Sequence, residues 1–236
     1  DLALDVSPKI RNSDGANVST EEGHFYAANS RGFQGGYPYS RHSLSVSPIA
    51  QEKRSKNSPM QRDFWYSSER DAKNLEKPKT IGKTAAERAI ARLGARKITT
   101  RNCPVIFEAP IASSLISHYV GAVSGSSLYR KSSWLLDSMG TQVWAPHITI
   151  KEDPFIPGAH GSSPFDEEGV KVSARTVVKK GVVNGYFLST YSGRKLGMPS
   201  TGNAGGTHNL QLTSTRTAVS LFVFLVTGST TGLPAL

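Results

Sequence analysis

The sequence predicts an α+β protein with largely antiparallel β-sheets, a few helices and two domains. Short β-type runs broken by turn residues fill much of the first half, and no regular alternation of strand and helix follows them. Two other stretches carry apolar residues at helical spacing. The 236 residues, of which 37% are hydrophobic, are enough for one large or two small domains with buried cores.

The first domain opens with a predicted antiparallel meander. Its β-type runs are 24–27, 36–39 and 42–46, with turn residues at 29–32 and 34–36. Residues 63–66 continue the sheet. We therefore expect short strands joined by tight turns.

A helix is predicted after this meander. Thr84 and Glu87 have the spacing of a capping box, in which two side chains bond to free amides at a helix start. Apolar residues recur on one face from Ala86 to Leu93, and Gly94 is a suitable stop. A linker is expected over 95–102.

The second domain begins with a buried-type strand at 104–107. Pro110 suits the first position of a helix that continues to Val123, because proline has no N–H to leave unpaired. A strand at 147–150 follows. A hairpin is then expected to join 172–178 to 182–188 through a turn at 179–181.

Composition excludes several classes of protein. The 28 basic and 18 acidic residues give a formal net charge of +10, but the excess is spread along the chain, so nucleic-acid binding is a secondary hypothesis. The longest apolar run, Leu221–Val226, is far shorter than the roughly 20 residues of a membrane helix. Residues 1–4 do not resemble a signal peptide, and the chain reads as one entered partway through. The single cysteine, Cys103, favours a reducing compartment and a cytoplasmic protein.

Few residues suggest chemistry by their spacing alone. The closest two of the six histidines are 13 residues apart, which does not match a zinc-binding helix. The acidic run 166–169 is interpreted as a solvated turn, since it lacks the alternating oxygens of a calcium loop. The stretch 200–208 is either a tight turn or a loop that exposes amides to an anion or a peptide carbonyl. At 129–131 two cations follow a tyrosine, a pattern typical of a surface.

Several segments occur in a fixed order along the chain. In the second half they are Leu128–Asp137, Ser163–Val170, Thr190–Gly197 and Ser200–Gly206. Upstream they are Ile10–Gly15, Gln34–Tyr37, Ser40–Ser45 and the helix ending at Leu93. Together, over roughly residues 5–210, they resemble the PmbA (TldE) branch of the TldD/PmbA metalloprotease family.

The resemblance implies a bacterial, cytoplasmic complex in which a TldD-type subunit pairs with a PmbA-type subunit. Such a complex acts on unfolded peptides, such as a microcin precursor or an antitoxin, and the family also carries a label as a modulator of DNA gyrase. Its TldD-type member binds metal through a His-Glu-x-x-x-His helix and a later cysteine. The matching positions here hold Ser113, Ser114 and His118, of which only His118 matches a ligand.

These substitutions imply a noncatalytic subunit without a metal site or cofactor of its own. A serine hydroxyl is a poor zinc ligand, and without the glutamate no base is positioned to take a proton from metal-bound water. We therefore expect the zinc in the TldD-type partner. The residues expected to serve the subunit interface or a peptide cavity are Tyr129, Arg130, Lys131, Ser200, Thr201, Gly202, Asn203, Gly205 and Gly206.

The same resemblance predicts the domain boundaries. Residues 1–97 form a central α+β domain whose N-terminal part is missing, 98–102 form a linker, and 103–236 form a truncated C-terminal metalloprotease-like domain. The tail 211–236 leaves the family pattern, which suggests a frameshifted or truncated reading, and its apolar run is aggregation-prone if unpaired. The chain is thus expected to be incomplete at both ends. Two alternatives remain: a basic nucleic-acid-associated or gyrase-modulating protein, and a nonfunctional truncated gene product.

Overall fold

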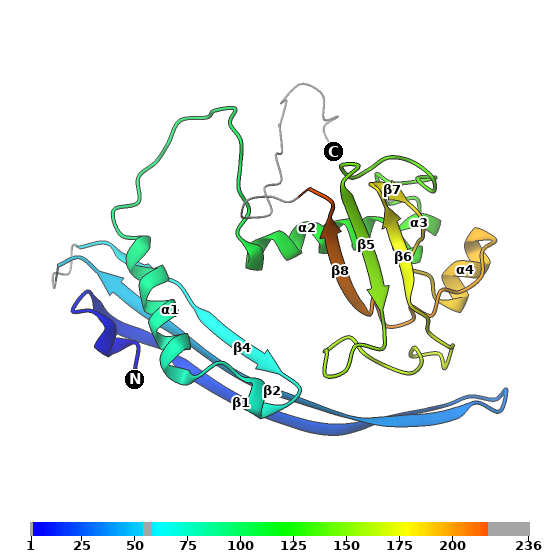
Figure 1. Ribbon diagram of the computed structural model, residues 1–236, viewed down its shortest axis with the longest axis horizontal. Coiled ribbons are helices and arrows are strands. Elements are labelled where there is room, and N and C mark those ends of the chain that lie inside the picture. Colours follow the sequence, from blue (N-terminus) through cyan, green and yellow to red (C-terminus); the bar gives the residue numbers. More distant parts are fainter. Residues whose placement is uncertain (1, 54–57, 217–236) are drawn as a thin grey trace. The chain divides into compact units, whose positions relative to one another are not determined.

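The computed structural model describes residues 2–53 and 58–216, and it divides into two compact units (Figure 1). Unit 1 comprises the residues up to 26 together with 36–98 and 157–160. Unit 2 comprises 27–35, 99–156 and the residues from 161 onward. Each unit has an antiparallel sheet, helices and its own hydrophobic core, which confirms the α+β class. Within the described ranges, no helix is long and apolar enough to cross a membrane.

The sheet of unit 1 has the order β1–β2–β3, and β4 also pairs with β2. The strands are β1 (Ile10–Ala28), β2 (Gln34–Gln51), β3 (Met60–Arg62) and β4 (Trp65–Glu69), and two short 3-10 helices are η1 (Leu4–Val6) and η2 (Ala72–Asn74). The antiparallel register sets Ala50 opposite Gln61 and Leu44 opposite Ser67.

The predicted short strands at 24–27, 36–39 and 42–46 are parts of the two long strands β1 and β2. The turn expected at 29–32 is confirmed: the side-chain oxygen of Asn29 accepts the N–H of Arg31 at 3.0 Å, and Gly32 has a φ of +88°. The turn expected at 34–36 is wrong, because these residues lie inside β2. Glycine pairs there are compatible with an extended strand as well as with a turn.

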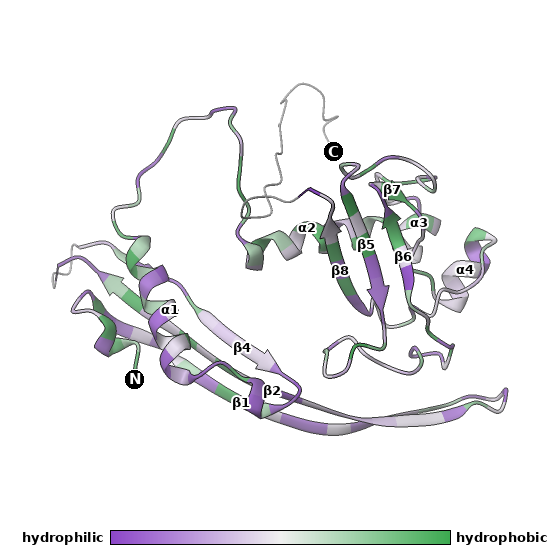
Figure 2. Ribbon diagram, in the orientation of Figure 1, coloured by the Kyte–Doolittle hydropathy of each residue, from purple (hydrophilic) through white to green (hydrophobic). Residues whose placement is uncertain are grey.

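Helix α1 (Pro78–Ala91) packs against η1, β3 and β4. Ile81, Ala85 and Ala89 recur every four residues and are almost fully buried, so they form the face that covers the unit 1 core. Hydrophobic and hydrophilic residues accordingly alternate along the helix in Figure 2. The predicted start at Thr84 is wrong by six residues, because Pro78, with its fixed φ and no N–H, already begins the helix.

Unit 2 contains a second sheet with the order β7–β6–β5–β8. Its strands are β5 (Ile148–Asp153), β6 (Arg175–Lys179), β7 (Val182–Val183) and β8 (Asn209–Ser214), and its helices are α2 (Ala109–Ala122), α3 (Gly125–Tyr129) and α4 (Thr190–Leu196). The predicted helix from Pro110 is confirmed as α2. The predicted hairpin is also present, but it is shorter than expected, with Val178 opposite Val183.

The strand predicted at 104–107 is wrong, because residues 95–108 contain no helix or strand. Val105 and Ile106 are 41% and 61% exposed, so their hydrophobic side chains do not enter a core. Cys103 in the same segment is an exposed free thiol. The apolar run Leu221–Val226 lies outside the described residues.

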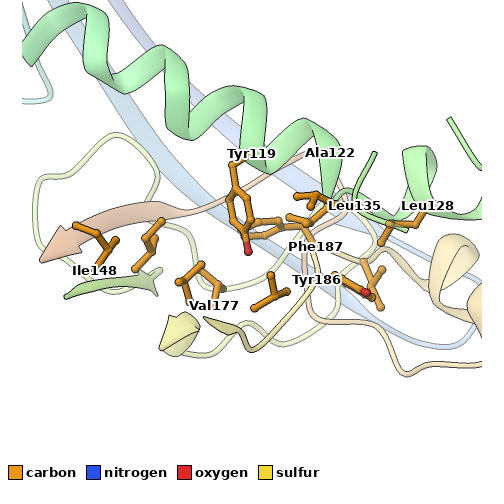
Figure 3. Close-up of a cluster of buried hydrophobic side chains, with 13 residues drawn as sticks. Tyr119, Ala122, Leu128, Leu135, Ile148, Val177, Tyr186 and Phe187 are labelled. Carbon is orange, nitrogen blue, oxygen red and sulfur yellow. The ribbon is translucent and has the colours of Figure 1, made fainter. Parts of the chain in front are cut away.

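The core of unit 2 lies between α2 and the sheet (Figure 3). Tyr119 and Ala122 come from α2, Ile148 from β5 and Val177 from β6, and all are buried. Phe187 lies beside Tyr119 in the same cluster. This core packs against α3 and the segment after β7, and both of these carry residues of the candidate functional site.

Candidate functional site

The positions that resemble a metal-binding helix lie on α2. Ser113 and Ser114 are exposed, and their hydroxyls donate to the carbonyl oxygens of Pro110 at 2.8 Å and Ile111 at 2.7 Å in the preceding turn. His118 is exposed as well. One imidazole and two neutral hydroxyls engaged with their own helix do not fit a zinc ion. Across the described residues, no group of three or more His, Cys, Asp or Glu could hold a metal ion.

The loop 200–208 is anchored to the sheet by a buried carboxylate. Glu152 on β5 is 1% exposed, and its Oε2 accepts a hydrogen bond from Arg175 Nε on β6 at 2.7 Å. Its Oε1 accepts from the side-chain amide of Asn203 at 2.7 Å and from the backbone N–H of His208 at 2.9 Å. Both oxygens are therefore paired, which is what allows a charged carboxylate to remain buried.

Arg175 extends this network toward the loop. Its two terminal nitrogens donate to the carbonyl oxygen of Tyr186 at 2.8 Å and to the side-chain oxygen of Asn203 at 2.9 Å. Its guanidinium lies 5.0 Å from the ring centroid of Phe187. The Thr201 hydroxyl also donates to the Asn203 oxygen, at 2.7 Å. The conformation of the loop is thus fixed by a charged network beneath it.

A second carboxylate holds the middle of the loop. The solvated turn expected at 166–169 is wrong for Asp166, which is 3% exposed. Its Oδ1 accepts from the N–H groups of Glu168 and Val170, both at 2.9 Å, and its Oδ2 accepts from the N–H of Ala204 at 3.0 Å. These three amide donors replace water around the charge, so burial of the side chain is tolerated.

Two tyrosines beside the loop each contact a cationic side chain. The rings of Tyr129 on α3 and Tyr191 on α4 meet edge to face at 5.6 Å between centroids. Arg130 Nε donates to the Tyr129 hydroxyl at 3.0 Å, and this hydrogen bond raises the pKa of the Arg130 guanidinium. Lys195 Nζ lies 5.7 Å from the ring centroid of Tyr191.

A cavity of about 360 Å³ opens among α3, α4 and the loop. It is lined by the C-terminal part of α2, hydroxyl-bearing residues, three aromatic rings and the glycine loop, namely Val120, Ser124, Gly125, Ser126, Tyr129, Phe187, Ser189, Tyr191, Ser192, Asn203, Ala204, Gly205, Gly206 and Thr207. Gly125 allows α3 to approach α4 closely, since a Cβ at this position would overlap the Ser192 side chain.

The structure brings some of the predicted site residues to this cavity. Tyr129, Asn203, Gly205 and Gly206 line it, and Arg130 is joined to it through Tyr129. The others lie around it: the Ser200 hydroxyl donates to Leu188 O at 3.1 Å, Thr201 bonds to Asn203, and Gly202 is buried with a φ of +73°. Lys131 is exposed and has a left-handed φ of +56°.

Sequence reasoning missed Glu152, Arg175 and Tyr191. Glu152 had a usable signal, because Ile148, Ile150 and Glu152 alternate along β5 and therefore share its buried face. An acidic residue at such a position needs an internal partner. Nothing in the spacing identifies that partner as Arg175, which is 23 residues away.

Two family models match the chain. "PmbA/TldA metallopeptidase C-terminal domain" matches residues 100–227, and "PmbA/TldA metallopeptidase central domain" matches residues 1–93. The C-terminal match continues past residue 211, the expected end of the family pattern, to residue 227. The chain therefore contains the central and C-terminal domains of a PmbA/TldA-type metallopeptidase. Together these matches show that the chain belongs to the PmbA/TldD metalloprotease family, as the resemblance implied.

Curated relatives support this assignment. The chain is 41% identical to "Metalloprotease PmbA" of Escherichia coli over 210 residues, covering 89% of this chain and 46% of that protein. It is also 41% identical to a PmbA homolog of Haemophilus influenzae, covering 88% of this chain and 45% of that protein. The chain thus spans less than half the length of these relatives.

Solved structures share the fold. A putative modulator of DNA gyrase from Thermotoga maritima matches with a TM-score of 0.78 and 27% identity, covering 89% of this chain and 49% of that one. TldE from Thermococcus kodakarensis matches with a TM-score of 0.69 and 20% identity, covering 92% and 50%, and this likeness concerns the fold alone.

Proposed function

We propose that this chain acts as the noncatalytic subunit of a heterodimeric metalloprotease, paired with a TldD-type subunit that holds the zinc. The observation that carries the proposal is the state of α2, where Ser113 and Ser114 bond back to their own helix in a chain that keeps the family fold. The identity to PmbA over most of the chain is 41%, whereas a TldD homolog of Haemophilus influenzae is 30% identical over 124 residues.

The chemistry of zinc hydrolysis supports a complex in which only the partner subunit holds the metal. Peptide hydrolysis by zinc requires ligands that keep the metal in place and a base that takes a proton from the metal-bound water. Ser113 and Ser114 supply neither, and His118 alone does not retain a metal. This chain therefore contributes the cavity and the glycine loop 200–206, which pack at the subunit interface or along the path of the peptide.

The proposed substrates are unfolded peptides, such as a microcin precursor or an antitoxin, in the bacterial cytoplasm. The cavity lies beside backbone amides of the loop, which suit an extended chain rather than a folded surface. Its polar and aromatic lining accepts varied side chains. A folded protein would be a poor ligand for so small an opening.

A second candidate is a basic binding protein that modulates DNA gyrase or associates with nucleic acid. The formal charge of +10 favours it, and so does the name of the Thermotoga maritima relative as a putative modulator of DNA gyrase. Binding to DNA that weakens steeply with salt would support this candidate. A nonfunctional truncated product is the third candidate, and insolubility both alone and with a partner would support it.

Co-expression tests the main proposal. The chain is expressed with a TldD-type subunit, and size exclusion is followed by a zinc-dependent assay on an unstructured peptide. We expect co-elution, and activity that disappears when the TldD-type subunit is omitted. Substitution of Gly205 and Gly206 should weaken pairing or processing, and unchanged pairing and processing would reject an interface or channel role for the loop.

A further inference from the structure

The cavity beside loop 200–208 is lined by two residues whose backbone N–H groups can donate to a ligand, Gly205 and Thr207. Its lining contains no charged side chain. Gly205 and Gly206 have φ angles of +92° and +132°, and neither carries a side chain that would cover the backbone. In the described part of the chain, the N–H groups of Gly205 and Thr207 have no acceptor. These amides are available to a ligand.

Tyr129 adds an oriented hydroxyl. Arg130 Nε donates to the Tyr129 oxygen at 3.0 Å, so the lone pair on that side is engaged. The phenolic proton is then left to donate, and among the described residues it has no acceptor. A ligand group next to Tyr129 should therefore be an acceptor, such as a carboxylate or a carbonyl oxygen.

Positive charge surrounds the tyrosine end of the cavity. Arg130 and Lys195 lie 5.5 and 5.7 Å from the centroids of the Tyr129 and Tyr191 rings, and within the described ranges neither forms an ion pair. At the other end, the Glu167 side chain lies against Gly205. A negative group on a ligand is thus favoured near the tyrosines and disfavoured near Gly205.

We propose that this cavity binds the C-terminal end of an extended peptide, with the free carboxylate at the Tyr129–Arg130 end and main-chain carbonyls on the amides of Gly205 and Thr207. The volume of about 360 Å³ lies at the small end of ligand pockets and suits only the last residues of a peptide. The inference rests on the proposed peptide-processing role and gives its substrate a chemical feature, a free C-terminus.

The test measures binding of an N-dansylated Ala-Ala-Leu-Ala peptide to the 236-residue chain by fluorescence anisotropy. The free acid is compared with the same peptide carrying a C-terminal amide. We expect saturable binding of the acid and at least tenfold weaker binding of the amide, because the charge-assisted hydrogen bonds are lost. Equal binding of the two peptides, or no binding of the acid, would overturn the inference.

Variants localise the effect to the cavity. Tyr191→Ala removes a ring that lines the cavity. Tyr66→Ala in unit 1 is the matched control, because Tyr191 and Tyr66 are similarly exposed, at 49% and 51%. Arg130→Gln should weaken binding of the acid about tenfold and leave the amide unchanged, with the exposed Lys73→Gln as its control. Unchanged binding by both Tyr191→Ala and Arg130→Gln would place the peptide elsewhere and reject this cavity.

The outcome is separable from that of the proposed function, because the binding assay needs no partner subunit. Carboxylate-dependent binding without co-elution would contradict the heterodimer alone. Co-elution and processing without a preference for the free acid would contradict the present inference alone.

Discussion

The buried carboxylate of Glu152 accepts the side-chain amide of Asn203 at 2.7 Å and so joins the central strand β5 to the glycine loop. Asn203 lines the cavity, whereas Glu152 lies in the interior. The shape of the cavity therefore depends on a charged group that a ligand does not touch.

Replacing Arg175 with methionine should destabilise the protein by about 3 kcal/mol or more, because it leaves the Glu152 carboxylate buried without its counter-ion. Urea unfolding measures the change. Lys9→Met is the matched control, since Lys9 and Glu52 also form a close pair, at 2.9 Å, but both side chains are exposed. The control should cost about 1 kcal/mol or less. Equal losses in the two variants would show that the Arg175 pair is not structurally important.

Substitution by alanine should change the stability of the protein in opposite directions at two helix glycines. Gly121 lies on the exposed face of α2 with open space around it, so Gly121→Ala should stabilise the protein by about 0.5–1 kcal/mol. Gly125→Ala should destabilise by about 1–3 kcal/mol, since the new methyl group overlaps Ser192. Thermal unfolding of both variants checks this. A shift of the same sign in both would contradict the close approach of α3 to α4.

Removal of the hydroxyl should change the unfolding free energy differently at two buried tyrosines. Burial raises the pKa of Tyr119, whose hydroxyl has no hydrogen-bond partner among the described residues, so Tyr119→Phe should be neutral or slightly stabilising. The Tyr186 hydroxyl accepts the N–H of Met139 at 2.9 Å, and Tyr186→Phe should cost about 1 kcal/mol or more. Unfolding free energies measured in urea compare the pair. The reverse order would contradict these side-chain placements.

Asp63 should contribute stability that is lost in acid. Burial alone would raise the pKa of its carboxyl, but the N–H of Phe64 and the charges of Arg92 and Arg88 outweigh burial and hold the pKa below 3.8. A lowered pKa gives stability that is fully present above 3.8 and lost as the pH falls through the folded value. Asp63→Asn should therefore be clearly less stable than the unsubstituted chain at pH 7.

The measurement is the difference in unfolding free energy between the two proteins as a function of pH. We expect a constant gap above pH 5 that narrows below pH 3.8. A difference in unfolding free energy that does not depend on pH would mean that Asp63 stabilises the protein by packing or neutral hydrogen bonds rather than by its charge.

Local periodicity in the sequence predicted the fold class and the position of α2, because the apolar stripe from Ala112 to Val123 has one interpretation. The start of α1 was missed because both Pro78 and Thr84 are suitable at a helix start. The helix begins at Pro78, the earlier of the two. The strand at 104–107 was overpredicted because hydrophobicity alone does not supply a pairing partner. Residue type indicates which secondary structures a segment can form, and tertiary contacts determine which of them it adopts.

The candidate site shows the same limit. From the sequence, the stretch 200–208 was either a tight turn or a loop with exposed amides, and four of the nominated residues line the cavity. The network of Glu152 and Arg175 was not visible, because it joins residues from two strands and a distant loop. Long-range pairing of single charged residues leaves no periodic signal.

We propose that this chain supports peptide hydrolysis without holding the metal. The most direct measurement is zinc-dependent peptide hydrolysis by the complex of this chain with a TldD-type subunit, with His118→Ala in this chain compared with substitution of the metal-binding helix of the partner. We expect full activity with His118→Ala and none after substitution of the partner's helix. Loss of activity with His118→Ala, or zinc-dependent hydrolysis by this chain alone, would contradict a noncatalytic role for this subunit.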